Sequence, residues 1–174
     1  KTRRQRQMCI RDSSRGAELE LKYQIFKNLN IKSSLAYLDT WTSKFSYSIA
    51  GDNVMIGGGR EAAMSPKLSS SLSINYMHKS IFGSVNHSFK DDYYFSDSHD
   101  MMSKKYALTN LSAGKDFGDF KIKAWVNNIF DKRYATRGFY FGLIPPNYED
   151  KLWLSYGDPR HYGISIEYKF IGPN

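Results

Sequence analysis

A two-residue alternation of apolar and polar side chains constrains this chain more than any other feature of its sequence. The final segment shows it most clearly, because apolar residues hold every second position: Tyr162, Ile164, Ile166, Tyr168 and Phe170. The positions between them hold His161, Gly163, Ser165, Glu167 and Lys169. Successive side chains of a β-strand point to opposite faces of its sheet, so the pattern predicts a strand that separates an apolar medium from a polar one.

Six earlier segments carry the same alternation with varying clarity. They are Ala17–Phe26, Ile31–Leu38, Pro66–Tyr76, Ile81–Lys90, Tyr106–Lys115 and Phe120–Asn128. Two of them depart from it, since Tyr106–Lys115 has apolar residues on both faces and Trp125 lies out of pattern in Phe120–Asn128. Joined by tight turns, these segments predict an all-β fold, an antiparallel meander of about seven long strands.

The connections between the expected strands alternate between short and long. Short ones lie at Lys27–Asn30, Met77–Ser80 and Asp116–Asp119, and long ones at Asp39–Met64, Asp91–Ser103 and Asp131–Pro159. Transmembrane β-barrels show this order because their turns are short on one side of the membrane and long on the other, whereas a soluble β-sandwich has no reason to keep it. Strands of roughly nine to eleven residues also suit a tilted crossing of a bilayer. We therefore predict that the short turns share one edge of a single sheet.

Aromatic residues close both ends of the final segment. Tyr162 precedes Phe170 by eight residues, which is about 19 Å along the membrane normal for a strand tilted by roughly 45°. Aromatic residues collect at both edges of the apolar layer of a membrane. We expect Tyr162, Tyr168 and Phe170 to form part of a lipid-facing aromatic girdle.

The formal charge of +8 does not indicate nucleic-acid binding. Residues 1–15 contain six basic residues and one acidic residue, so the other 159 residues carry only +3 and show no basic stripe. Cys9 is the only cysteine, and a chain without further thiols fits passage through an oxidising periplasm. We expect no nucleic-acid partner.

The two ends of the chain differ from the rest. Residues 1–13 show neither strand nor helix periodicity, and the stretch Met8–Ser13 resembles a translated sequencing adapter. We interpret residues 1–13 as a non-native or disordered segment, with a basic arm as the alternative, and residues 171–174 as a short tail.

The sequence offers no arrangement that indicates catalysis or a resident cofactor. The four histidines, His78, His87, His99 and His161, lack the close spacing of metal ligands. The run Gly57-Gly58-Gly59-Arg60 lacks the lysine, the Ser or Thr and the following helix of a phosphate-binding loop, and no nucleophile elbow occurs. We predict a protein that is not an enzyme, with no catalytic residue, metal site or cofactor.

Two aromatic clusters lie where expected strands enter the long loops, at Asp91–Phe95 and Arg137–Phe141. They have two possible roles, as part of the membrane girdle or as a stacking surface for an aromatic or chelated ligand, with Arg137 supplying charge. Pro145-Pro146 stiffens the second loop, which lowers the entropy lost when it closes on a ligand. The candidate ligand-binding residues are Trp41, Tyr94, Arg137 and Tyr140.

Three motifs resemble those of TonB-dependent outer-membrane receptors. The run Asn127-Asn128-Ile129-Phe130-Asp131-Lys132-Arg133-Tyr134 is similar to the motif that ends their penultimate strand, and Tyr162 to Phe170 is similar to their last-strand signature. Ser14–Glu20 resembles the opening of an earlier strand in the same family. The resemblance covers residues 14–170 and departs from the family at the end, where Ile171–Asn174 follow the terminal aromatic residue.

The resemblance implies that residues 14–170 are the C-terminal part of a transmembrane barrel of about twenty-two strands, with a plug domain in its lumen that this chain lacks. Such receptors lie in the outer membrane of Gram-negative bacteria and contact its lipid. They take up scarce nutrients such as ferric siderophores, haem or cobalamin, with energy from the TonB complex acting through the missing N-terminal region. The extracellular ligand would be a small molecule or a metal chelate.

Two other classes of function remain open from the residues alone. A secreted or surface β-rich adhesin or glycan-binding domain would have long strands without a lipid-facing girdle. An outer-membrane barrel enzyme, such as a protease or phospholipase, would need an outward-facing Asp–His or Ser–His pair.

Overall fold

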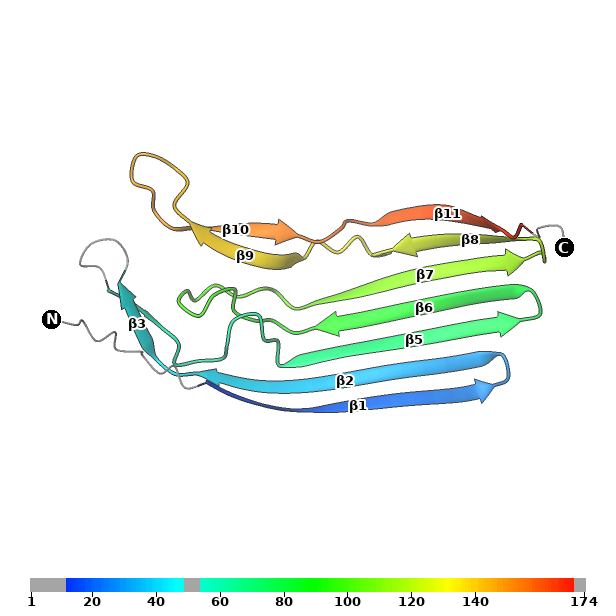
Figure 1. Cartoon of the computed structure of the whole chain (residues 1–174), viewed down its shortest axis with the longest axis horizontal. Helices are drawn as coiled ribbons and strands as arrows, with labels where there is room; N and C mark the ends of the chain where they lie inside the picture. The colour runs from blue at the N-terminus through cyan, green and yellow to red at the C-terminus, as the bar shows by residue number, and fades with distance from the viewer. Residues whose placement is uncertain (1–11, 49–53, 171–174) are drawn as a thin grey trace.

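Seven long strands form one antiparallel sheet in the computed structural model, which describes residues 12–48 and 54–170. They are β1 (Asp12–Phe26), β2 (Leu29–Thr42), β5 (Leu68–His78), β6 (Ile81–Lys90), β7 (Tyr106–Asp116), β8 (Phe120–Asn127) and β11 (His161–Tyr168). Each pairs with the next long strand along the chain, in the order β1-β2-β5-β6-β7-β8-β11 (Figure 1). The all-β meander predicted from the alternation is therefore confirmed. No helix in the described ranges has the length and apolar character needed to cross a membrane.

Two short hairpins lie within the long connections, where the sequence predicted only loops. β3 (Phe45–Ser48) pairs with β4 (Val54–Gly57), and β9 (Ala135–Phe141) pairs with β10 (Lys151–Tyr156). Each hairpin forms a separate two-stranded sheet. The alternation did not predict β3 and β4 because a segment of four residues is too short to establish a period.

The turns and the long connections lie at opposite ends of the sheet, as the sequence predicted (Figure 1). The β1–β2, β5–β6 and β7–β8 turns form the end that we call the turn end. The β2–β5, β6–β7 and β8–β11 connections form the other end, called the loop end. At the turn end, Gly118 has a φ of 95°, and its N–H donates to Asp116 Oδ1 at 2.8 Å, so the β7–β8 turn needs a residue without Cβ there.

The register sorts side chains into an apolar face and a polar face. One row across all seven long strands contains Tyr23, Ile31, Ile74, Val85, Leu111, Val126 and Tyr162. The adjacent positions, which point the other way, are Lys22, Lys32, Ser73, Asn86 and Asn110 on β1 to β7, and the paired Asn127 and His161 on β8 and β11. These rows define the apolar face and the polar face of the sheet, since neighbouring positions on a strand lie on opposite sides.

Polar side chains bond to each other across the polar face. Ser34 and Ser71 hydroxyls lie 2.7 Å apart, and Ser84 and Ser112 hydroxyls lie 2.8 Å apart. Trp125, which broke the alternation, also lies on this face and donates through Nε1 to Ser165 Oγ at 3.3 Å. Its ring occupies the space beside Gly163, where a Cβ would come 2.7 Å from the ring, so a glycine on β11 accommodates the unexpected tryptophan.

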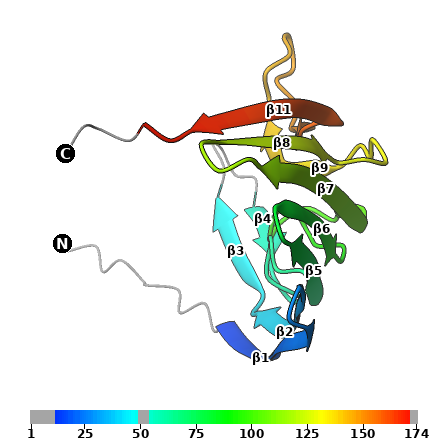
Figure 2. The same ribbon diagram turned by 90° about the vertical axis from the view of Figure 1, so that its right-hand side faces the viewer.

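Among the described residues, no second layer covers the apolar face. Figure 2 shows the long strands as one curved layer, with β1 and β11 at its two edges. Tyr162, Ile164 and Ile166 are 79%, 72% and 71% exposed, whereas a soluble sandwich would bury such residues beneath another sheet. Among the described residues the buried hydrophobic side chains are Tyr93 and Phe95, both in the β6–β7 connection. The sheet therefore separates two media, and the packed core of the described residues lies among the loops.

The ordered sheet begins slightly earlier than the sequence indicated. β1 starts at Asp12, and Asp12 and Ser13 pair with Thr42 and Trp41, although both fall in the segment 1–13 that was set apart. Residues 1–11, 49–53 and 171–174 lie outside the described residues.

Candidate functional site at the loop end

Tyr93 and Phe95 form the centre around which the long connections pack. Both are nearly inaccessible to solvent, and their rings meet edge to face at 5.8 Å. The Tyr93 hydroxyl donates to the Thr136 carbonyl of β9 at 3.1 Å. Gly138 of β9 lies against Phe95, and a Cβ at this position would come 2.6 Å from the ring. These contacts fix the β9–β10 hairpin to the β6–β7 connection.

Arg60 joins the β2–β5 connection to the β6–β7 connection. Its Nη2 donates to the carbonyls of Ser96 and His99 at 2.9 and 2.6 Å, and its Nη1 donates to the Asp100 carboxylate at 2.5 Å. The guanidinium also lies 4.1 Å above the ring centre of Tyr94. A guanidinium presents a planar set of donors and a face that stacks on aromatic rings, so one side chain makes all four contacts.

Hydrogen bonds donated by backbone amides tie the same two connections together. Asp97 accepts from the Ala63 N–H through Oδ1 at 2.7 Å and from the Gly58 N–H through its carbonyl at 2.8 Å. The Tyr94 carbonyl accepts from the Met64 N–H at 2.8 Å. The two connections therefore form one hydrogen-bonded unit.

The glycine run beside Arg60 has a structural explanation. Gly58 and Gly59 both have a φ of 72°, which side chains with a Cβ rarely adopt. A Cβ on Gly58 would come 2.1 Å from the Ser43 carbonyl oxygen. The run lets the chain turn close to the end of β2 and place Arg60 over Tyr94.

His99 and Tyr140 attach the β9–β10 hairpin to this unit from another side. Their rings are stacked, with centres 3.6 Å apart and planes within 7°. His99 Nε2 lies 4.0 Å from the Asp150 carboxylate, which approaches from the β9–β10 loop. Burial raises the pKa of Tyr140 above its ordinary value, so its phenol is neutral at physiological pH.

The cluster contains a serine, a histidine and an aspartate, the residue types of a hydrolytic triad: Ser96, His99 and Asp150. Their geometry does not support a triad. Ser96 Oγ lies 3.0 Å from His99 Nδ1, but it also accepts from the Ser98 N–H at 3.1 Å, as in a local serine turn. Asp150 lies beyond hydrogen-bond distance from His99. One face of the imidazole is covered by Tyr140. The arrangement fits a packed loop better than an activated nucleophile.

The structure brings together two of the four predicted ligand-binding residues. Tyr94 and Tyr140 both join the cluster of Arg60 and His99, and both are half-buried. Trp41 is exposed at the end of β2, where the register places it on the apolar face, opposite Ser13. Arg137 is exposed on β9 opposite Ser155. In the described part of the chain, neither has a ring contact, ion pair or side-chain hydrogen bond with Tyr94 or Tyr140.

The sequence did not predict that Arg60, His99 and Asp100 belong to this cluster. Arg60 lies about forty positions from the residues it contacts, and no spacing rule connects residues so far apart in different loops. The only signal was the glycine run before Arg60, which marks a close approach of the backbone. Among the described residues, no group of three or more His, Cys, Asp or Glu could hold a metal ion.

The Asn127–Tyr134 motif acts as a structural junction between β8 and β11. Asn128 is 4% exposed with a φ of 50°. Its Nδ2 donates to the carbonyls of Lys132 and Asp158, both at 3.0 Å, and its Oδ1 accepts from the Lys132 N–H at 2.9 Å. Asp131 Oδ1 accepts from the Arg160 N–H at 2.8 Å. The motif therefore holds the chain where it leaves the sheet and where it returns.

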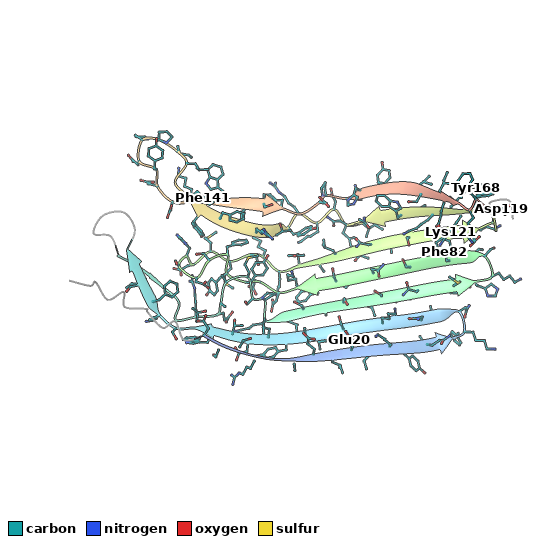
Figure 3. All side chains as sticks on the ribbon, viewed as in Figure 1. Glu20, Phe82, Asp119, Lys121, Phe141 and Tyr168 are labelled. Atoms are coloured by element: carbon teal, nitrogen blue, oxygen red, sulfur yellow. The ribbon has the colours of Figure 1, made fainter. Side chains whose placement is uncertain are left out.

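The three expected girdle residues lie on or just beyond β11. Tyr162 lies near the loop end, and Tyr168 and Phe170 lie at the turn end, where their rings meet at 4.8 Å. Figure 3 shows Tyr168 beside Asp119 of the turn end, with Phe141 at the opposite end of the molecule. All three are exposed.

Comparison with known proteins adds a family and a set of similar folds. The family described as TonB dependent receptor-like, beta-barrel matches residues 11–129. Among solved structures, the ferric yersiniabactin uptake receptor FyuA from Yersinia pestis is similar, with a TM-score of 0.75 and 17% sequence identity. The match covers 93% of this chain and 24% of the FyuA chain.

Two further structures are similar. The siderophore receptor PiuA from Acinetobacter baumannii has a TM-score of 0.72 and 17% sequence identity, and the match covers 90% of this chain and 22% of the PiuA chain. The copper transporter OprC has a TM-score of 0.63 and 17% sequence identity, and the match covers 91% of this chain and 24% of the OprC chain. At these identities the likeness concerns the fold, and the chain spans about a quarter of the length of each of the three structures.

Proposed function

Because the chain belongs to the family of TonB-dependent receptor-like β-barrels, we propose that it forms part of the barrel wall of a receptor that takes up a scarce nutrient across the outer membrane of a Gram-negative bacterium. The observation that carries this proposal is the uncovered apolar face. On β11 its side chains Tyr162, Ile164 and Ile166 are each more than two-thirds exposed. Exposed apolar surface of this extent is costly in water and favourable in lipid.

In this proposal the apolar face contacts lipid and the polar face lines the lumen. Tyr162 lies at one edge of the apolar layer, and Tyr168 and Phe170 lie at the other. The turn end then faces the periplasm and the loop end faces outward, since long loops of outer-membrane barrels are extracellular. The TonB complex would supply the energy for import by the whole receptor.

The proposed ligand is a metal chelate of the ferric-siderophore class, with other small nutrients as alternatives. FyuA and PiuA are receptors for such compounds, whereas OprC is a copper transporter. Tyr94, Tyr140 and Arg137 would contribute aromatic faces and positive charge to the vestibule. Trp41, on the apolar face beyond the expected membrane edge, is better placed as an interfacial anchor than as a vestibule residue.

The other two classes of function have less support. An adhesin or glycan-binding domain does not explain an apolar face that nothing covers. A barrel enzyme lacks support because Ser96, His99 and Asp150 do not have the geometry of a catalytic triad.

Uptake measurements on the full-length receptor test the proposal. We expect deletion of its gene to abolish uptake of one member of a panel of radiolabelled ferric siderophores, ferric haem and cobalamin, and the intact gene to restore it. A receptor lacking residues 136–148 should reach the surface at normal levels but lose most of this uptake. Normal uptake of the whole panel without the gene would contradict the transport proposal, and normal uptake by the truncated receptor would contradict the vestibule.

A further inference from the structure

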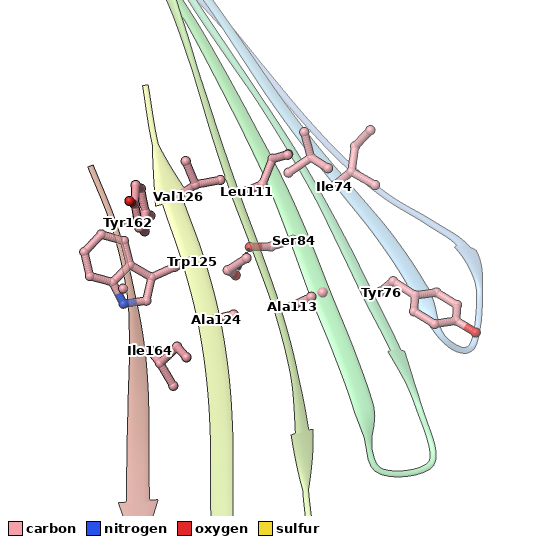
Figure 4. Close-up of a pocket in the computed structure, with 14 residues that line it drawn as sticks. Ile74, Tyr76, Ser84, Leu111, Ala113, Ala124, Trp125, Val126, Tyr162 and Ile164 are labelled. Atoms are coloured by element: carbon pink, nitrogen blue, oxygen red, sulfur yellow. Dashed lines mark hydrogen bonds between the residues drawn. The ribbon is translucent and has the colours of Figure 1, made fainter. Parts of the chain in front are cut away.

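The apolar face contains a groove of about 960 Å³ in its central part. Its floor lies over small residues: Gly83 of β6, Ala113 of β7 and Ala124 of β8, which the register aligns in one row. Larger side chains stand on both sides. Figure 4 shows Ile74 and Tyr76 of β5 along one wall, and Tyr162 and Ile164 of β11 along the other.

The packing of the sheet does not require these small residues. A Cβ on Gly83 would meet only the Ser112 carbonyl oxygen, at 3.4 Å, which is an ordinary contact, and the φ of Gly83 is not in the left-handed region. Ala113 and Ala124 are exposed, so no neighbouring side chain limits their size. Glycine inside a strand weakens it and often marks a close approach by another molecule. The row of small residues therefore leaves space on the surface that the fold itself does not use.

A polar pair lies at the loop end of this groove. His87 and Thr109 each lie two residues from a groove residue, Val85 and Leu111, and on the same face. His87 Nδ1 and Thr109 Oγ1 are 2.9 Å apart. When the Thr109 hydroxyl donates to Nδ1, the ring carries its proton on Nε2 and can donate it to an acceptor oxygen. His87 is exposed, so this donor is accessible from the surface.

We propose that the groove binds a phosphate-bearing lipid of the outer leaflet, with its acyl chains along Gly83, Ala113 and Ala124 and a headgroup oxygen on His87 Nε2. The proposal rests on the function proposed above, because it needs the apolar face to lie in the membrane with the loop end outward. The polar pair then lies toward the headgroups, and the apolar groove continues toward the centre of the membrane. The polar pair followed by the apolar groove thus has the same arrangement as a lipid, whose polar headgroup is followed by apolar acyl chains.

The structure argues against a β-strand as the occupant. β5, β6, β7 and β8 are paired along both edges beneath the groove, so their backbone groups are not free to bind an added strand. An occupant must bind through apolar contact and a few polar groups. The groove spans the width from β5 to β11, four strand spacings or roughly 19 Å, which suits a lipid with several acyl chains side by side.

The test measures lipid binding by the full-length receptor purified in detergent. The probes are lipid A, which bears phosphates, and a diacylglycerol, which bears none. Gly83→Leu and Ala113→Leu fill the groove with apolar volume, and we expect each to weaken lipid A binding roughly tenfold or more, as overpacking of an apolar contact does. Ala107→Leu, on the same face of β7 outside the groove lining, is the matched control and should bind as the wild type does.

A headgroup variant tests the polar end separately. His87→Leu should weaken binding of lipid A and leave binding of diacylglycerol unchanged, because only the phosphate oxygen loses its donor. Heat-modifiable migration in gels verifies that each variant is folded. Wild-type-like lipid A binding by Ala113→Leu and Gly83→Leu, or a co-purified protein in place of lipid, overturns the groove proposal. A wild-type protein that stays out of the detergent phase contradicts the membrane function instead, so the two failures are distinguishable.

Discussion

At the residue scale, the Asn128 side-chain amide explains why the Asn127–Tyr134 motif holds the junction between β8 and β11. Asn128 is buried, satisfies three backbone groups through its side chain, and adopts a positive φ that asparagine tolerates better than most residues. Phe130 of the same motif is instead exposed to solvent. The physical content of the motif is therefore hydrogen bonding at the β8–β11 junction.

Replacing Asn128 should destabilise the barrel wall, and two different substitutions separate its hydrogen bonding from its tolerance of a positive φ. Asn128→Ala loses the hydrogen bonds and strains the backbone, and we expect it to lower the free energy of unfolding by about 2–4 kcal/mol. Asn128→Gly keeps the backbone freedom and should recover part of that loss. Asn127→Ala removes one side-chain contact, with His161 at 3.1 Å, and serves as the control. Urea unfolding in lipid vesicles measures the effect, and equal values for Asn127→Ala and Asn128→Ala would refute it.

Arg60 is the second residue whose removal has a defined consequence. Lysine cannot reproduce the planar donors or the stacking of a guanidinium, so Arg60→Lys should loosen the β2–β5 connection from the β6–β7 connection. We expect hydrogen exchange of the Gly58, Ala63 and Met64 amides to rise by roughly tenfold or more. Lys67→Met is the matched control in the same connection, because Lys67 is solvent-exposed and its ion pair with the half-buried Glu61 contributes little. Unchanged exchange in Arg60→Lys would mean that the backbone bonds alone hold the loops.

At the element scale, the sequence predicted the long strands far better than the loops. β6 has the predicted bounds, Ile81–Lys90, because an alternating strand between lipid and water must keep its period along its whole length. β9 and β10 have no such constraint. Both faces of the hairpin carry apolar residues, with Phe139 opposite Trp153 on one face and Tyr140 opposite Leu152 on the other, so alternation fails there. The Arg60–Tyr94–His99–Tyr140 cluster joins three connections, and only the three-dimensional structure reveals it.

The attachment of the β9–β10 hairpin should weaken at alkaline pH. Burial raises the pKa of Tyr93 and of Tyr140, so the folded loops favour the neutral phenols. This contribution to stability is fully present below the ordinary tyrosine pKa of about 10 and is lost as the pH rises through the higher folded values. We expect proteolysis within residues 142–150 to increase over that alkaline range, following tyrosine absorbance at 295 nm. In Tyr93→Phe, the hydroxyl contact with Thr136 is already lost, so cleavage should be faster at neutral pH and depend less on pH.

At the scale of the whole molecule, the sheet has the organisation of a wall and not of a globular core. Its strands lengthen from eight residues in β8 and β11 to fourteen and fifteen in β2 and β1. A tilted crossing needs about nine to eleven residues, so the ends of β1 and β2 project beyond the apolar layer at the loop end. The Arg15–Asp39 ion pair and Trp41 lie in this projecting part, where charged and amphipathic groups can meet water or headgroups.

The same substitution should therefore have very different effects on the stability of the sheet when it is placed on the two faces of one strand. Ile74 and Asn75 are neighbours near the middle of β5, on the apolar and the polar face. Lysine at the centre of the lipid face of a barrel costs about 2–4 kcal/mol, because its charge must leave water, whereas lumen positions remain hydrated. We expect Ile74→Lys to lower the free energy of unfolding in vesicles by about that amount, and Asn75→Lys to change it by less than ~0.5 kcal/mol. If both variants lost equal stability, neither face would be in lipid. If Asn75→Lys were the more damaging, the apolar and polar faces would have been assigned to the wrong media.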